Sequence, residues 1–356
     1  MTRKLLLIDD APILGGAELF GLRLARWLQR ERPDRWTTEI ACPAGSALAV
    51  RCAQESIPVH AAAFPDLGPR GVPGMPPAVR AVARLLRDAA RTDALVVATT
   101  ARAQAYTAAA QLVTRGGAPF VNLLLEQDTA ARPSARFVLR RTGRLVAIGE
   151  NTAAAYGTAL PGMHVGRLNN FLDPRAFRAE RPARGPRPDG AAPALGLLAR
   201  VIPEKGVLDL IEELARCPSS WSTLVVVGDE QDAPYAARVR ARIGELGLGD
   251  RAILKGFVSE IEAFLSEIDA LVVPSVGNEG QPTVIVEGLA HGLPVIVRRP
   301  IWSRDFEGLP VLPYTDPGEL ADAIARSREL GPAPADELER RFGPEQALDA
   351  LIAAGS

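Results

Sequence analysis

The sequence predicts an α/β protein built from two doubly wound domains, and two observations carry this prediction. Short apolar runs rich in Val, Leu and Ile alternate with amphipathic stretches almost throughout the 356 residues. Such runs are typical of parallel strands buried on both faces, and strand–helix alternation is typical of doubly wound sheets. One proline-rich stretch, residues 178–193, breaks this rhythm, which restarts at Ala194.

The two domains divide around that stretch, since a chain of this length exceeds what one hydrophobic core usually holds. We expect an N-terminal Rossmann-like domain, a linker, a C-terminal Rossmann-like domain and a helix returning to the N-terminal domain, at residues 1–172, 173–193, 194–335 and 336–356. The strand candidates are residues 4–9, 94–99, 119–125, 144–149, 194–199, 222–228, 251–256, 270–275 and 294–297. Helical patterns lie between them, for example at 17–31, 206–217 and 259–268.

Composition argues against several classes of protein. The three cysteines and three histidines are scattered, and no spacing suits a disulfide framework or a zinc site: Cys42, Cys52, Cys217, His60, His164 and His291. The apolar run near the N-terminus is too short for a signal peptide core or a membrane span. We therefore expect a cytoplasmic protein that holds no metal and has no nucleic-acid partner.

Charge is distributed unevenly along the chain. Residues 1–150 contain 20 Lys and Arg against 13 Asp and Glu, whereas the remainder contains 21 against 29. The basic excess gathers in two groups, Arg80, Arg84, Arg87 and Arg91, then Arg132, Arg136, Arg140, Arg141 and Arg144. The spacing of the first group places its members on one side of a helix. This side is either a solvated helix face or a surface that meets anionic lipid or an anionic acceptor.

A glycine pair follows the first predicted strand. Gly15 and Gly16 open the first predicted helix, in the segment GGAE. Glycine lets the backbone approach a ligand closely, and the following helix offers N–H groups to an anion. A tight structural turn would explain the pair equally well.

Two cations flank a predicted turn at the end of the strand at 194–199. Arg200 directly follows this strand, and Lys205 and Gly206 lead into the next helix. An arginine offers a forked set of donors and a lysine a point charge, so the two can close on a diphosphate. Solvated loop cations are the alternative.

Two glutamates bracket a predicted helix N-terminus in residues 274–297. Glu279 precedes the helix and Glu287 lies about two turns into it, while His291 is interpreted as a helix-end residue and not a base. Backbone N–H groups at the N-terminus can bind phosphate oxygens, at Gly280, Gln281, Pro282 and Thr283. A glutamate in an apolar helix is costly to bury without a partner, which favours a ligand role over a packing role.

In combination these segments resemble the retaining glycosyltransferases of family 4, a group 1 family with the GT-B fold. The shared marks are the glycine pair, an Arg followed five residues later by Lys-Gly, and two Glu separated by seven residues. Residues 256–276 and 167–177 are also similar to family segments. The resemblance spans residues 4 to about 350 and is strongest over 196–297.

The resemblance implies two Rossmann-like domains that face each other across a cleft and transfer a hexosyl group from a nucleoside-diphosphate sugar, expected to be a UDP-sugar. Arg200 and Lys205 would bind the diphosphate, and Glu279 would hold hydroxyls of the donor sugar. The remaining implied contacts are Glu287 with the ribose, Phe257 and Val258 with the base, and Gly16 with the diphosphate from the opposite domain. Family members need no metal, and no resident cofactor is expected.

One departure from the family lies after the strand at 119–125. The family often has a histidine there, near the reacting sugar, and this chain has Glu126, Gln127 and Asp128. A carboxylate such as Glu126 could stabilise an oxocarbenium-like transition state, or the position could meet a different donor sugar. The serine that usually heads the next loop is replaced by Gly149.

Two other functions stay open, a nucleotide-sugar epimerase or hydrolase of the same fold, and an inactive nucleotide-sugar-binding partner of another transferase. The acceptor could be a natural-product aglycone, a glycolipid or polysaccharide precursor, or a small polyol. We expect it to meet the loop at residues 62–77 and the surface around Arg102 and Tyr106. Peripheral contact of the N-terminal domain with an anionic membrane is a further expectation.

Overall fold

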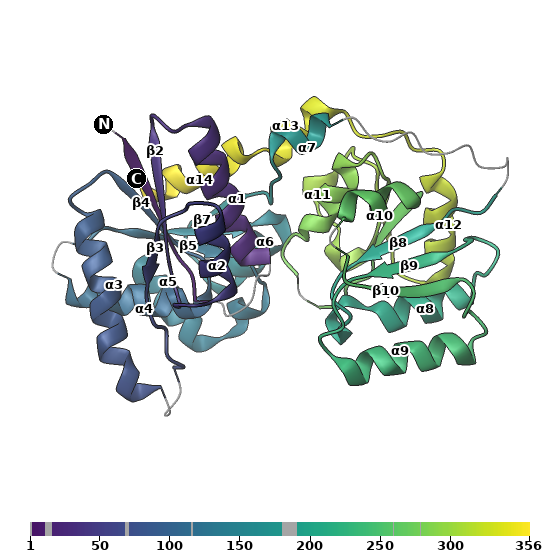
Figure 1. Ribbon diagram of the computed structural model, residues 1–356, viewed down its shortest axis with the longest axis horizontal. Helices are drawn as coiled ribbons and strands as arrows, with labels where there is room; N and C mark the ends of the chain where they lie inside the picture. Colours follow the sequence, from purple (N-terminus) through teal and green to yellow (C-terminus); the bar gives the residue numbers. More distant parts are fainter. Residues whose placement is uncertain are drawn as a thin grey trace. The chain divides into compact units, whose positions relative to one another are not determined.

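The computed structural model describes residues 2–10, 16–67, 71–114, 117–179, 191–258, 260–277 and 279–356, and it divides into two compact units (Figure 1). The N-terminal domain comprises Met1–Asp173 together with Phe342–Ser356. The C-terminal domain comprises Pro174–Arg341. Among the described residues, no helix is both long enough and apolar enough to cross a bilayer.

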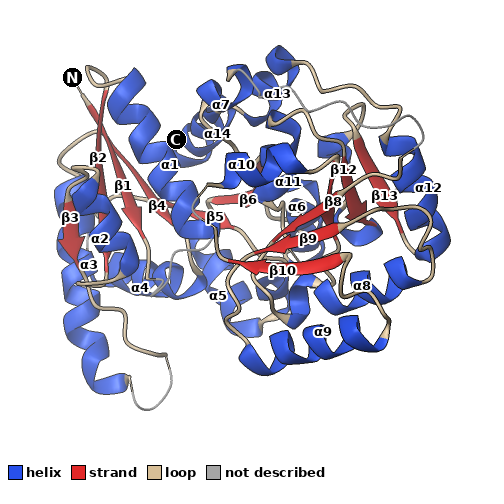
Figure 2. Cartoon of the chain, turned by 45° about the vertical axis from the view of Figure 1, so that its right-hand side comes forward, coloured by secondary structure: helices blue, strands red, loops and turns tan. Residues whose placement is uncertain are grey.

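The N-terminal domain contains a seven-stranded parallel sheet in the order β3-β2-β1-β4-β5-β6-β7, and Figure 2 labels its strands from β3 to β6. Its strands are β1 (Arg3–Ile8), β2 (Trp36–Cys42), β3 (Val59–Ala61), β4 (Ala94–Ala98), β5 (Phe120–Leu124), β6 (Leu145–Ile148) and β7 (Val165–Leu168). Its helices are α1 (Gly16–Glu31), α2 (Ala47–Gln54), α3 (Met75–Ala89), α4 (Ala101–Val113), α5 (Pro133–Thr142), α6 (Gly149–Ala159) and α14 (Pro344–Gly355). Short 3₁₀ turns occur at η1 (Val72–Gly74) and η2 (Asp128–Ala131).

Helices cover both faces of this sheet, which explains the continuous apolar run of β1. Leu5 and Leu7 pack with residues of α1 and α14 in one core. Leu6 and Ile8 pack with residues of α3 and α4 in a second core. Since successive side chains of a strand point to opposite faces, every residue of this run is buried.

The C-terminal domain contains a six-stranded parallel sheet in the order β10-β9-β8-β11-β12-β13. Its strands are β8 (Leu195–Leu198), β9 (Leu224–Val227), β10 (Ala252–Gly256), β11 (Ala270–Val273), β12 (Val295–Arg298) and β13 (Val311–Tyr314). Its helices are α7 (Pro174–Arg178), α8 (Val207–Ala215), α9 (Ala233–Glu245), α10 (Ile261–Glu267), α11 (Thr283–Ala290), α12 (Pro317–Ser327) and α13 (Ala335–Phe342). Its 3₁₀ turns are η3 (Pro203–Lys205), η4 (Arg299–Ile301) and η5 (Arg304–Phe306).

The predicted fold class is confirmed, and each of the nine predicted strands forms. The structure adds β2, β3, β7 and β13, whose sequences are not continuous apolar runs. β2 interleaves polar residues with apolar ones, and β3, β7 and β13 lie at sheet edges. An edge strand pairs on one side only, so it tolerates exposed residues and even Pro313, which lacks an N–H group.

The C-terminal segment contains two helices instead of the single one expected. α13 precedes Gly343, and α14 follows it and packs in the N-terminal domain, where Leu348 and Leu351 enter the core beside α1. Figure 1 shows α14, in yellow, among the purple and blue elements of that domain. The Gln346 side chain adds two 3.0 Å hydrogen bonds with the backbone of Asn169, accepting from its N–H and donating to its carbonyl.

We predict that Leu351→Ala destabilises the N-terminal domain by about 2–5 kcal/mol, the usual range for truncating a fully buried leucine. Leu351 is fully buried, whereas the neighbouring Asp349 is exposed. Hydrogen exchange should therefore become faster in β1 and β4, and Asp349→Ala should leave it unchanged. Equal protection of β1 in the Leu351 variant and the parent would contradict the packing of α14.

Candidate functional site

The two charged motifs of the C-terminal domain leave adjacent strands at the point where the strand order reverses. Lys205 lies in the loop after β8, and Glu279 lies in the loop after β11. β8 and β11 pair with each other. β9, which follows β8 in the sequence, lies on one side of this pair, and β12, which follows β11, lies on the other side. The carboxyl ends of parallel strands at such a switch point form the usual ligand site of a doubly wound sheet.

The two loops touch at Gly206. This glycine has φ 67° and ends the turn η3, and a Cβ atom built on it would lie 2.2 Å from the carbonyl oxygen of Pro274. The left-handed conformation and the close approach together require glycine. Two hydrogen bonds fasten the loops further, because the Glu204 carbonyl accepts from the backbone N–H groups of Val276 (3.0 Å) and Gly277 (3.2 Å).

An ion pair joins the two motifs across this contact. Lys205 Nζ donates to Glu279 Oε1 at 2.7 Å, and both side chains are about four-fifths buried, with exposed fractions of 21% and 20%. Partial burial strengthens the attraction between the charges but also makes their desolvation costly. The arrangement places a cation that can bind phosphate oxygens directly beside a carboxylate that can accept from hydroxyl groups.

Arg200 lies at the same edge of the sheet. Its side chain is exposed, and Nη1 donates to Gln231 Oε1 at 3.1 Å. Gln231 comes from the loop after β9, the strand next to β8. Since a guanidinium carries five N–H donors, Arg200 can contact a ligand anion while it keeps this bond.

Helix α11 begins at Thr283, shortly after Glu279 in the sequence. Gly280 and Gln281 are buried, Pro282 is the N-cap residue with no side-chain acceptor for the first turn, and Thr283 is the first helical residue. The N-terminal N–H groups of a helix favour anions. Glu287 is partly buried one turn further along.

A charged cluster that the sequence did not reveal supports the loop after β11. Arg298, the last residue of β12, donates from Nε to the Pro274 carbonyl (3.2 Å) and from Nη2 to Glu213 Oε1 (2.9 Å). The aromatic ring of Tyr314 lies 5.6 Å from its guanidinium carbon. Burial raises the pKa of Glu213, and the charge of Arg298 opposes that shift. Arg298 stands in a plain strand sequence, so no motif could have identified it.

Phe257 and Val258 follow β10, at the same edge of the sheet as the motif loops. The Phe257 side chain is 78% exposed, and Val258 is half-buried. An exposed aromatic ring can stack on a planar ligand group. Their contact with a base stays a prediction.

The remaining candidates belong to the N-terminal domain. Gly15 and the side chain of Asp128 lie outside the described residues, and Gly16 is the first residue of α1. Glu126 follows the carboxyl end of β5 with an exposed side chain, and Gln127 is half-buried. The roles of these residues stay predictions.

One part of the expected acceptor surface is wrong. Tyr106 is buried, and its hydroxyl donates to the Pro65 carbonyl at 2.9 Å. Arg102 forms ion pairs with Asp10 (2.7 Å) and Asp66 (2.8 Å). These two residues therefore fasten the loop at residues 64–66 to α4, and of the two only Arg102 retains an accessible side chain, 38% exposed.

The sequence of this domain matches a known family. The family model described as Glycosyl transferases group 1 matches residues 192–328, most of the C-terminal domain. The C-terminal domain is thus similar to the group 1 glycosyltransferases, and we refer to it as the group 1 domain. The resemblance that the motifs indicated is thereby confirmed for the region where it is strongest.

Individual relatives agree with this family. This chain is 30% identical over 174 residues to the 2-deoxystreptamine glucosyltransferase of Streptomyces kanamyceticus, and the aligned region covers 45% of this chain and 43% of that protein. It is also 30% identical over 166 residues to the lipopolysaccharide core biosynthesis glycosyltransferase LpsE of Rhizobium meliloti (strain 1021), with 45% of each covered. The chain thus spans less than half of the length of the curated relatives it matches.

A solved structure extends the fold comparison to the whole chain. The crystal structure of Anabaena HepE in complex with UDP and glucose matches with a TM-score of 0.74 over 98% of this chain and 99% of that chain, at 23% identity. The chain therefore has the GT-B fold, and the group 1 domain is the second of its two Rossmann-like units.

We predict that Gly206→Ala lowers the free energy of unfolding of the group 1 domain by roughly 1–3 kcal/mol, because alanine is strained at positive φ and its Cβ would collide with Pro274. Gly244→Ala in α9 is the matched control. A Cβ there meets nothing within 4 Å, and alanine favours a helix by up to about 1 kcal/mol. Chemical denaturation should show opposite signs for the two variants, and an unchanged Gly206 variant would refute the contact.

Proposed function

We propose that this protein transfers a hexosyl group from a UDP-sugar to an acceptor, with retention of configuration at the anomeric carbon. The observation that carries the proposal is the Lys205–Glu279 pair, which sets a phosphate-binding cation against a hydroxyl-binding carboxylate at the switch point of the sheet. The match to the group 1 family and the UDP complex of a protein of the same fold support a nucleotide-sugar donor.

The donor diphosphate would lie against three sources of positive charge. Arg200 and Lys205 supply formal charges, and the N-terminus of α11 supplies backbone dipoles at Gly280–Thr283. Negative charge accumulates on the diphosphate as the sugar–phosphate bond breaks, so these groups would stabilise the transition state more than the ground state. In this proposal they replace a metal ion as the partner of the leaving group, and no resident cofactor takes part.

The two glutamates would divide the rest of the donor between them. Glu279, which pairs with the phosphate-binding Lys205, would accept hydrogen bonds from sugar hydroxyls near the reacting carbon. Glu287 would accept hydrogen bonds from the ribose diol. Phe257 and Val258 would contact the base. Glu126, at the carboxyl end of β5, would stabilise the positive charge of the oxocarbenium-like transition state.

The acceptor is a small molecule or a lipid-linked sugar, and its class stays open. We also propose that the N-terminal domain contacts an anionic membrane peripherally, on the cytoplasmic side. The excess of arginines in this domain supports that contact.

We predict that UDP stabilises the protein more than GDP, ADP or dTDP does. Binding to the native state alone raises the apparent stability by about 2.7 kcal/mol at a hundredfold excess over the dissociation constant. A thermal-shift titration with the four nucleotides measures this, and no shift with UDP would count against the donor assignment. Release of UDP from a UDP-sugar only when acceptor is present would separate a transferase from a hydrolase, an epimerase and an inactive binding protein.

We predict that the charged residues of the site separate binding from chemistry. Arg200→Ala and Lys205→Ala should weaken UDP binding and lower turnover by roughly 10²–10³-fold, as loss of one preorganised donor does. Lys255→Ala is the matched control, because Lys255 pairs with Glu267 on the surface of the same domain. Calorimetry and steady-state kinetics give the two quantities.

We predict a different effect for Glu279→Gln. Turnover should fall by a similar factor, while UDP binds at least as tightly as in the parent, because the carboxylate that neutralises Lys205 has been removed. Glu287→Gln should instead weaken UDP and spare much of the rate at saturation. Full turnover of folded Glu279→Gln would overturn the assignment.

A further inference from the structure

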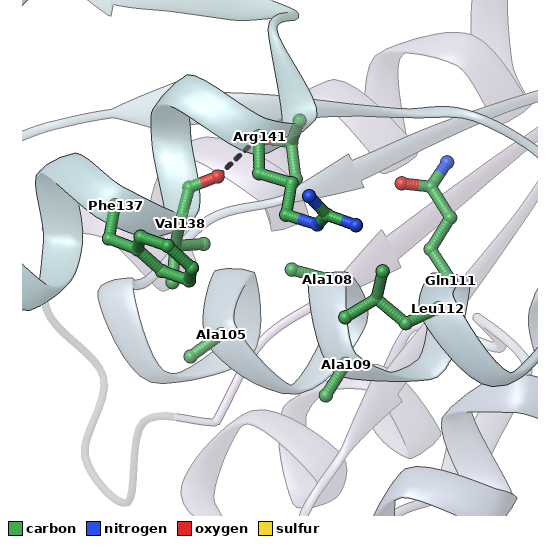
Figure 3. Close-up of a pocket in the computed structure, with 9 residues that line it drawn as sticks. Ala105, Ala108, Ala109, Gln111, Leu112, Phe137, Val138 and Arg141 are labelled. Carbon is green, nitrogen blue, oxygen red and sulfur yellow. Dashed lines mark hydrogen bonds between the residues drawn. The ribbon is translucent and has the colours of Figure 1, made fainter.

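Large apolar side chains are exposed on one face of the N-terminal domain. Leu112, near the end of α4, is 62% exposed, and Phe137 on α5 is 72% exposed. Leu112 and Phe137 lie on either side of a shallow groove of about 380 Å³ between the two helices (Figure 3). The floor of this groove is made of small residues such as Ala108. We refer to these side chains and the exposed side of α5 as the α4–α5 face.

Such exposure is unusual for a monomeric soluble surface. Single exposed apolar residues need no explanation, but a group of them around a groove marks a binding surface. The buried side of α4 packs into the core through Ala103, Tyr106 and Ala110. Leu112 and Phe137 are exposed and therefore make no contribution to the core that would account for them.

The charges around these side chains have one sign. Residues 129–149 contain five arginines and no acidic residue. Arg140 and Arg141 are exposed and lie about one turn along α5 from Phe137, and Arg141 also lines the groove. Figure 3 shows the Arg141 side chain reaching over the groove between Val138 and Gln111.

Helix α3 provides an internal comparison. Arg80, Arg84 and Arg87 are exposed along one side of it, opposite its buried residues, as the sequence spacing predicts. However, the large apolar side chains of α3 within the described residues are all buried or half-buried. The acidic Asp88 also lies in this row and pairs with Arg91. The α3 side therefore offers charge alone.

We infer that the α4–α5 face is the surface by which the N-terminal domain docks on a bilayer with anionic headgroups. Phe137 and Leu112 would enter the interfacial region, where aromatic and aliphatic side chains are favoured. Arg140 and Arg141 would reach lipid phosphates while their aliphatic stems stay at the apolar level. The combination of apolar side chains with unopposed arginines favours a lipid surface over an anionic protein. This inference rests on the membrane contact proposed above and is independent of sugar transfer.

The test is co-sedimentation with vesicles of phosphatidylglycerol and phosphatidylcholine in about equal parts. Arg140→Gln/Arg141→Gln should weaken binding roughly 25-fold, about fivefold for each basic residue near an anionic surface. Phe137→Gln should weaken it about tenfold, and phosphatidylcholine vesicles alone should bind poorly. Binding of the parent should fall as salt rises, because the Debye length shortens. The control Arg84→Gln/Arg87→Gln removes the same charge from α3 and should have a much smaller effect.

Three outcomes would overturn the inference. Equal or larger losses in the α3 control would keep the membrane contact but move it to α3, whereas absence of vesicle binding by the parent at low salt would remove the contact altogether. A change of molecular mass in Phe137→Gln, with unchanged vesicle binding, would show that a second copy of the chain covers the face. All substituted side chains are exposed, and an unchanged melting temperature together with unchanged UDP release would confirm that the fold and the proposed activity are intact.

Discussion

The geometry of the C-terminal site depends on the contact between the backbone of Gly206 and the carbonyl of Pro274. Without a side chain at residue 206, the loops after β8 and β11 come close enough for the Glu204 carbonyl to hold the second loop by two hydrogen bonds. That approach brings Lys205 and Glu279 together although 74 positions separate them in the chain. Arg298, at the end of the neighbouring strand β12, donates to the same Pro274 carbonyl and is itself held by Glu213. The charged groups of the site are thus positioned by backbone contacts between the loops that follow two paired strands.

The sequence predicted the parts of this site that follow from local chemistry. Cations beside a turn, a glutamate ahead of a helix and a glycine between them are visible in the order of residues. The direct pairing of Lys205 with Glu279 was not predicted, because it depends on a distance between two loops and not on a spacing within one. Arg298 was not predicted for a related reason. Its role depends on contacts with the loop after β11, helix α8 and strand β13, and none of these contacts is visible in the sequence.

The strands likewise divide into those that the sequence predicts and those that it does not. Strands in the middle of each sheet are buried on both faces and read as continuous apolar runs, so their positions were predicted within about two residues. β2, β3, β7 and β13 have polar residues or proline because an edge or an exposed face relaxes that requirement. Tyr106 was assigned to a surface because the sequence cannot show which side of α4 faces the loop at Pro65.

The place of α14 has a consequence for how the chain folds during synthesis. The N-terminal sheet is complete once β7 has left the ribosome, but the core on one of its faces still lacks Ala347, Leu348 and Leu351. These residues follow the whole C-terminal domain, so at usual translation rates they arrive roughly 10–30 s later. During that interval β1 and α1 expose an apolar surface that nothing in the nascent domain covers. The C-terminal domain, whose segment is continuous, can reach its final structure first, which reverses the order expected from position in the chain. A chaperone that binds nascent chains would therefore find its site on the first domain to be made.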